Sequence, residues 1–176
     1  GIDPEEIPGP VSASVLGRAF CIVSIYMPLT VYILHYIPLM FHLPQYGSVV
    51  DYLLFILPML FASTFLGDML KPLVTERESS FLVFVFTSLI FLFVSGLTWP
   101  RYAMNPLWYI VGSLVPATWG IQGFIGINSN DATLADMSTP YLMLWVLTIA
   151  FYFSAVIIDK CARRYDRRHY TLNSVP

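Results

Sequence analysis

Long apolar stretches alternate with short polar ones along this chain, and charged or turn-forming residues bound each apolar stretch. A helix needs about 17–25 mostly apolar residues to cross the hydrocarbon core of a bilayer. Four stretches meet that requirement. The pattern therefore predicts four transmembrane helices, at residues 16–43, 50–70, 81–97 and 141–158.

The first stretch is too long for one straight crossing, because a helix rises 1.5 Å per residue and the hydrocarbon core is ~30 Å thick. Pro28 and Pro38 lie inside it. Proline removes a backbone donor and kinks or breaks a helix. We expect a bent or broken helix whose far end lies in the membrane interface.

A fifth apolar stretch, residues 104–126, is interrupted by prolines and glycines. Lysine and arginine prefer the cytoplasmic ends of spans. If this stretch turns back, eight of the nine basic residues lie inside and Arg101 alone lies outside. If it crosses, the basic tail and the loop holding Lys71 and Arg77 lie on opposite sides. The charges favour a re-entrant helical hairpin that enters from the outer face, with an ordinary further span as the alternative.

Composition supports a membrane protein: 57% of the residues are hydrophobic and 11% are charged, against about 25% charged in soluble domains. We therefore predict an all-α integral membrane protein with four transmembrane helices and an outer re-entrant hairpin. Its parts are a cytoplasmic loop at 1–13, a transmembrane domain at 14–168 and a tail at 169–176. The two cysteines imply no disulfide framework, and Cys21 is expected to be a small core residue.

Candidate chemistry is sparse. The sequence holds no phosphate-binding glycine-rich loop and no spaced metal-binding motif, so no cofactor, no metal and no catalytic residue is expected on this chain. His35 and His42 share a helix face if their helix is continuous, but two ligands are too few for a metal. Asp51 is expected near a helix start, where the dipole favours negative charge. Asp68 is expected to pair with Lys71 three residues on.

Two functions can be considered from the residues alone, and the first is an intramembrane enzyme. It requires His35, His42, Asp51 and Asp68 to converge on one pocket, whereas the predicted topology places Asp68 at the inner face and the others toward the outer face. A membrane scaffold without transport is the second alternative. It predicts no cleft between spans and no ATPase partner.

Several motifs follow one another in a specific order. They read SGLTWP at 95–100, MNPLW at 104–108, PAT at 116–118 and GF at 123–124. In this order they resemble the membrane subunit of type-2 ATP-binding-cassette (ABC) exporters, over roughly residues 16–168. Asn105 departs from that pattern by standing between Met104 and Pro106. Gly126 departs from it by standing where the family often has an arginine.

The resemblance implies a permease subunit of an ATP-driven exporter in the bacterial inner membrane, working by alternating access. A separate ATPase subunit would bind the ATP and Mg, and a second permease, identical or paralogous, would complete the pathway. Lipid bilayer is expected around it, and no nucleic acid. The family usually has six spans, so two further spans are expected upstream. The cargo stays open.

The sequence offers two sets of site residues. The resemblance implies that the hairpin and the loop before it form part of an outer gate. The charged loop between the second and third spans is either a solvated loop or a docking contact for a cytoplasmic partner or a neighbouring helix. The gate candidates are Trp99, Pro100, Met104, Trp108, Pro116 and Trp119, and the coupling candidates are Glu76, Arg77 and Glu78.

Overall fold

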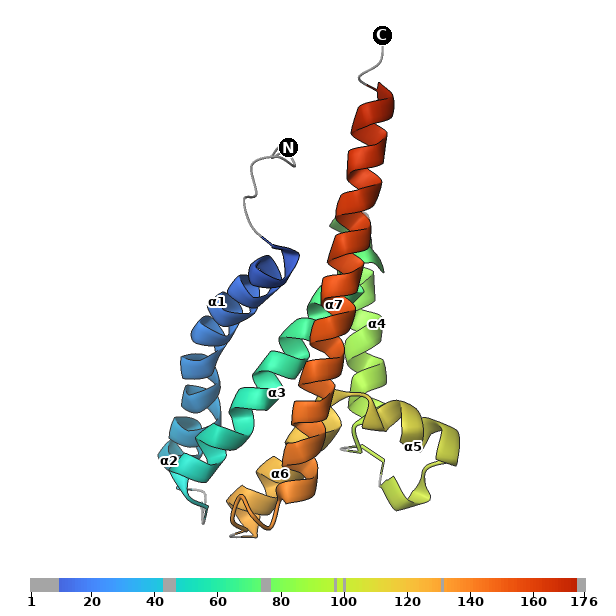
Figure 1. Ribbon diagram of the computed structural model, residues 1–176. Coiled ribbons are helices and arrows are strands. Elements are labelled where there is room, and N and C mark those ends of the chain that lie inside the picture. Colours follow the sequence, from blue (N-terminus) through green and yellow to red (C-terminus); the bar gives the residue numbers. More distant parts are fainter. Residues whose placement is uncertain are drawn as a thin grey trace.

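A computed structural model describes residues 10–42, 47–73, 77–96, 98–99, 101–130 and 132–173 (Figure 1). Helices make up most of this described part, and no strand occurs in it, so the all-α class is confirmed. In chain order the elements are α1 Val11–Val31, the π-helix η2 Tyr32–Tyr36, α2 Ile37–Met40, α3 Val49–Leu70, the 3-10 helix η3 Lys71–Leu73, α4 Arg77–Val94, the 3-10 helix η4 Arg101–Ala103, α5 Pro106–Ser113, α6 Pro116–Ser129 and α7 Ser138–Asn173.

The first three elements follow one another without a gap and form one apolar helical stretch, Val11–Met40. Pro28 lies inside α1, and the π-helical turn ends two residues before Pro38 of α2. A proline ring clashes with the carbonyl four residues earlier in an α-helix, here that of Leu34. The wider π turn relieves that clash locally. Of the bent or broken helix expected here, the break does not occur: the stretch stays continuous and changes its winding at the π turn.

Two ends of the molecule can be told apart in Figure 1. At the first, which we call the basic end, α1 begins, α3 ends and α7 continues toward the C-terminus. Arg18, Lys71 and Arg163 belong to these segments. At the second, the α5–α6 end, α3 and α7 begin and α6 lies beneath them. Consecutive long helices therefore run in opposite directions between the two ends.

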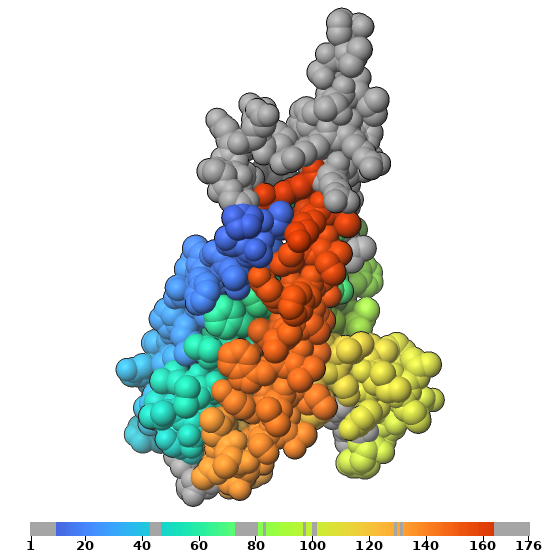
Figure 2. Space-filling model, in the orientation of Figure 1, coloured from blue at the N-terminus to red at the C-terminus, as the bar shows by residue number. Residues whose placement is uncertain are grey.

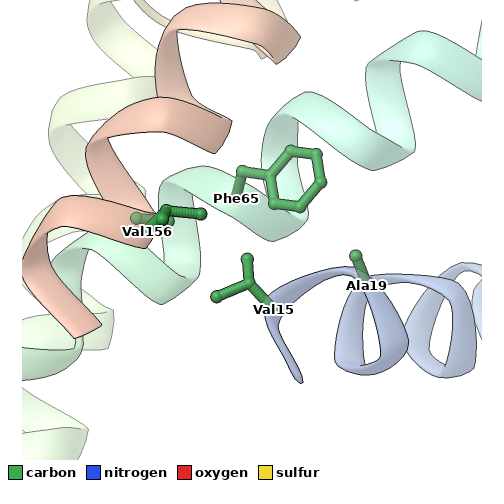
Figure 3. Packing of buried hydrophobic residues seen from close by; sticks show 5 residues of the cluster. Val15, Ala19, Phe65 and Val156 are labelled. Carbon is green, nitrogen blue, oxygen red and sulfur yellow. The ribbon is translucent and has the colours of Figure 1, made fainter. Parts of the chain in front are cut away.

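Near the basic end, α1, α3 and α7 meet in a small apolar cluster of buried residues (Figure 3). Ala19 and Ala155 are small, which lets the helix backbones approach closely in a membrane environment. The cluster consists of Val15, Ala19, Phe65, Ala155 and Val156.

Toward the α5–α6 end, a second cluster joins α3, α6 and α7. It consists of Tyr52, Phe55, Ile56, Ile127 and Leu144. Between the clusters, the buried Thr148 hydroxyl of α7 donates to the carbonyls of Pro58 (3.1 Å) and Leu144 (2.7 Å). The first of these bonds crosses between helices, so α3 and α7 are joined by both apolar packing and a polar link.

The remaining long helix, α4, packs mainly on α5 and keeps most of its apolar side chains exposed. Figure 2 shows α5 projecting from the side of the bundle formed by α1, α3 and α7. The α4–α5 pair is therefore a separate arm attached to a packed three-helix body.

Three helices are long and apolar enough to cross a membrane: Val11–Met40, Val49–Leu70 and Ser138–Arg163. The count becomes four if α5 and α6, which meet at an 84° bend, together form one broken span. The helix predicted at 81–97 corresponds to α4, whose described apolar part, Phe84–Val94, is shorter than a span. The four predicted crossings and the re-entrant hairpin thus remain predictions, whereas a multi-pass membrane protein is established.

Candidate functional site

A cavity of about 520 Å³ lies between the last turns of α4 and the segment leading into α5. Three of the gate candidates, Trp99, Met104 and Trp108, line it together. Asn105 contributes an amide to a lining that is otherwise apolar or aromatic among the described residues. The sequence-based grouping of these three gate residues corresponds to one concave surface in the structure.

The start of α5 is set by the residue that departs from the family motif. The Asn105 side-chain oxygen accepts a hydrogen bond from the Leu107 backbone N–H at 3.1 Å. Asn105 is therefore the N-cap of α5, with Pro106 at the first helical position, where its missing N–H costs nothing. The inserted asparagine fixes where the helix begins beside the cavity.

Two side chains of α6 fold back onto the end of α5. The buried Thr118 hydroxyl donates to the Gly112 carbonyl at 2.7 Å, and the Trp119 indole N–H donates to the Ser113 carbonyl at 2.7 Å. These carbonyls lie in the last turn of α5, whose acceptors have no partner within the helix. The Gly112 carbonyl also accepts from the Val115 backbone N–H at 3.1 Å. These bonds together pair carbonyls at the end of α5 and hold the 84° bend between the helices.

Pro116 and Trp119 are gate candidates that lie at this bend, away from the cavity. Pro116 is fully buried at the first turn of α6. Trp119 packs against the cluster around Phe55. They position the bend, whereas Trp99, Met104 and Trp108 form the cavity. Pro100 lies outside the described residues.

Close backbone contacts attach both helices. A Cβ placed on Gly112 would lie 2.6 Å from the Val94 carbonyl oxygen, so α5 packs directly on the end of α4. A Cβ on Gly123 would overlap the Phe55 ring, so α6 packs directly on α3. Both positions require glycine for this packing.

At the basic end, Arg18 of α1 forms ion pairs with two carboxylates. Its Nη2 atom lies 3.5 Å from Asp68 of α3 and 3.7 Å from Asp159 of α7. Arg163 adds a second cation 3.5 Å from Asp159. The expected local pair between Asp68 and Lys71 is wrong, because the larger guanidinium of Arg18 reaches Asp68 across the helix interface.

This charge cluster is only partly solvated. The side chains of Asp68 and Asp159 are each 15% exposed and that of Arg18 is 36% exposed. Arg18 Nε and Asp68 Oδ2 are buried without a hydrogen-bond partner in the described part of the chain. Such charges at the edge of a bilayer are costly to leave unpaired. The cluster therefore ties the three long helices together at this end.

The coupling candidates lie between α3 and α4. Glu76 is outside the described residues, and Arg77 and Glu78 begin α4 with side chains that the structure does not describe. Their proposed contact with an ATPase stays a prediction.

The residues required by the enzyme alternative do not converge. Asp51 lies in the first turn of α3 and Asp68 near its end, 17 residues apart in the sequence, which is about 25 Å along a helix. His42 lies past the end of α2 with φ 53°, so it does not share a continuous helix with His35. No group of three metal-ligating side chains occurs among the described residues.

Sequence reasoning used Arg18 only as a marker of the inner side and Thr118 only as part of the PAT motif. It did not single out Asp159, and it misplaced Cys21, which is exposed on α1. Two charges within or beside apolar stretches, at Arg18 and Asp159, were the available signal, because such charges usually pair. Thr118 belongs to the PAT motif, and its hydrogen bond now gives that motif a structural role.

Several apolar helices long enough to cross a bilayer define a multi-pass membrane protein. The model of the ABC-2 family transporter proteins matches residues 8–158, and the chain belongs to that family. No curated protein and no solved structure matches it. Members of this family are membrane subunits of transporters and are not themselves catalytic.

Proposed function

We propose that this chain is the membrane-spanning permease subunit of an ATP-driven exporter in a bacterial inner membrane. A separate ATPase subunit supplies the energy, and a second permease, identical or paralogous, completes the translocation pathway. The observation that carries the proposal is the family match over residues 8–158 together with the separation of the basic end from the α5–α6 end.

Charge orients the subunit in this proposal. The basic end faces the cytoplasm, because lysine and arginine are retained there. The α5–α6 pair then faces outward as a re-entrant element, in which α6 packs against α3 and α7. The Thr118 and Trp119 hydrogen bonds support this reading, since they hold the bend closed in a way that a straight span does not need.

In this mechanism ATP binding draws the two ATPase subunits together, and the permeases rearrange against each other. The three-helix body tied by Arg18 moves as one unit, because separating α1 from it would leave Asp68 without its counter-ion and Asp159 with Arg163 alone. The α4–α5 arm is attached less firmly and serves as the outer gate.

The test is co-reconstitution of the chain, in its natural full-length protein, with the ATPase that copurifies with it. Inside-out proteoliposomes should accumulate substrate only when ATP is hydrolysed, and hydrolysis should fall when Arg77→Ala or Glu78→Ala weakens the coupling loop. Lys160→Ala, an exposed change at the same end, is the matched control. Transport into right-side-out vesicles, or hydrolysis indifferent to the coupling variants, would contradict the proposal.

A further inference from the structure

We propose that a single water molecule binds where the first helix, α3 and the end of α6 meet, hydrogen-bonded to the Tyr52 hydroxyl and to the side chains of His35 and Asn128. Through this water the end of α6 is fastened to the other two helices. The site lies at the α5–α6 end of the molecule, and it needs neither an ATPase nor a transported substrate.

The Tyr52 hydroxyl is a buried polar group without a hydrogen-bond partner in the described part of the chain. Tyr52 is 7% exposed and belongs to the apolar cluster around Phe55. Its ring packs edge-on against Phe124 of α6, with the ring centroids 5.8 Å apart. Buried polar groups are nearly always hydrogen-bonded to protein or to ordered water, because leaving them unpaired is costly. The Tyr52 hydroxyl therefore needs a bound molecule as its partner.

A small cavity beside Tyr52 supplies the space for that molecule. Its described walls come from η2, from the residue Gly47 before α3, from the start of α3 and from the end of α6. The cavity holds about 10 Å³, close to the roughly 10–15 Å³ that one water molecule needs. Pockets for organic ligands hold about 300–1,000 Å³. The size of the cavity therefore selects water.

Two further polar side chains line the same cavity. His35 comes from η2, and Asn128 comes from the last turn of α6. A neutral imidazole offers one donor and one acceptor, and a side-chain amide also offers both. With the Tyr52 hydroxyl, they supply the roughly three partners that a buried water usually has. None of the described lining residues is Asp, Glu, Lys or Arg, so a bound ion would lack a counter-charge.

Two backbones touch beside this cavity. A Cβ placed on Gly47 would overlap the Ile127 carbonyl oxygen, so the chain entering α3 packs directly on α6. The main contacts of η2, by contrast, are with α1 and α2 of its own helical stretch. The bound water therefore adds a polar link from η2 and α3 to the end of α6.

Removing the hydroxyl tests the site by the sign of its effect on stability. Tyr52→Phe should lower the melting temperature by about 2–4 °C, because a hydrogen bond is lost. If the hydroxyl had no partner, the same change would leave the melting temperature unchanged or raise it, and either result would refute the proposal. Tyr141→Phe, at a partly buried tyrosine near Phe55, is the matched control and should shift it by less than about 1 °C.

Combining Tyr52→Phe with Asn128→Leu tests whether the two residues share the water. The Tyr52 hydroxyl has no direct partner in the described part of the chain, so coupling between these residues reports a molecule bound to both. The combined variant should lose less stability than the sum of the single losses. Tyr141→Phe combined with Asn128→Leu should be additive. Additivity in both pairs would refute a shared water.

Radiolytic footprinting detects the water in the unchanged full chain, reconstituted in nanodiscs. Hydroxyl radicals that X-rays generate from a bound water oxidise the side chains beside it, even buried ones. Tyr52 should be oxidised, whereas Phe55, also buried and one turn further along α3, should stay below detection. Replacing sodium chloride with choline chloride should change nothing. Protection of both residues, or labelling that depends on the salt, would overturn the water assignment.

Hydrogen exchange tests whether the water fastens α6. Tyr52→Phe should speed amide exchange several-fold in the last turn of α6, around Ile127, because a link to that turn is lost. Amides around Ala155, near the basic end, should exchange at their usual rate. Unchanged exchange in α6 would refute the fastening role.

Discussion

Phe55 of α3 and Phe86 of α4 occupy helices of similar apolar character, yet the first is 1% exposed and the second is 64% exposed. Phe55 touches Gly123 of α6 and packs near Tyr141 of α7, where glycine and a polar link allow close approach. The α4 helix has a phenylalanine-rich surface and packs mainly on the short α5. In a bilayer, apolar character alone does not bring helices together, because lipid is equally apolar. Small residues and polar links decide which helices join the body and which form the arm.

The largest expected contrast comes from truncating these two phenylalanines. Phe55→Ala should lower the free energy of unfolding by about 3 kcal/mol, because it leaves a cavity among α3, α6 and α7. Phe86→Ala should lower it by less than about 0.5 kcal/mol, since lipid fills the space. Steric-trap unfolding in bicelles measures both. Equal losses would show that α4 is packed as firmly as α3.

A smaller effect is expected from Arg18→Gln, which leaves Asp68 and Asp159 near each other without their shared cation. We expect a loss of about 2 kcal/mol, below the value for a fully buried pair because these groups are partly solvated. Lys71→Gln is the matched control and should change stability by less than about 0.5 kcal/mol.

A double-mutant cycle measures the interaction energy between Arg18 and Asp68. Adding Asp68→Asn to Arg18→Gln should recover part of the loss, since the uncompensated charge is removed. Strict additivity of the two changes would show that the ion pair contributes nothing to holding α1 on the body.

Two glycines should respond to alanine with opposite signs. Gly112→Ala places a Cβ 2.6 Å from the Val94 carbonyl oxygen and should destabilise the α4–α5 contact by about 1 kcal/mol. Gly67→Ala, with open space around its position on α3, should be neutral or stabilise the helix by up to about 1 kcal/mol. Thermal unfolding compares the two, and a shared sign would remove the argument for close packing of the arm.

The smallest effect concerns the polar turn before α7. The Thr133 hydroxyl and backbone N–H both donate to Asp136, and these hydrogen bonds hold the pKa of Asp136 below its usual value. These hydrogen bonds therefore stabilise the turn at pH values above the usual aspartate pKa of about 3.9. The stabilisation is lost as the pH falls through the lowered pKa of the folded protein.

Carbon-13 NMR of the Asp136 carboxyl measures that pKa directly. Thr133→Val removes the hydroxyl donor and should raise it toward the ordinary value, while Thr133→Ser should keep it low. A pKa insensitive to both changes would rule out the hydroxyl as its main cause.

The body was more predictable from the sequence than the arm. The apolar run that forms α3 predicted its bounds to within one residue at the start, because an uninterrupted spanning pattern leaves few alternatives. In the interrupted stretch 104–126 the sequence did not say where helices begin; the structure starts one at Pro106 and one at Pro116, where proline suits the first helical turn. The prolines in the first helix predicted a bend or a break, and the helix does not break because a π turn precedes Pro38.

The charge pairing was less predictable. Arg18 and Asp159 lie 141 residues apart in the printed sequence, and only the packing of α1 against α7 brings them together. The local rule that pairs residues three or four apart favoured Lys71 for Asp68, but a partner from another helix prevailed. The cavity likewise depends on the orientation of α5 relative to α4. The close contact between Gly112 and Val94 sets that orientation, and the residue pattern of a single helix does not predict it.

The π turn at Tyr32–Tyr36 has a consequence for how this protein tolerates length changes. A π turn accommodates one residue more than an α turn of the same height, so the chain here holds a spare position. Deleting one residue from that turn should restore ordinary α-helical winding. The flanking segments should keep the same faces toward their neighbours. The same deletion inside α3 would rotate everything beyond it by about 100° and misalign its buried face. Insertions and deletions in relatives should therefore concentrate at this turn.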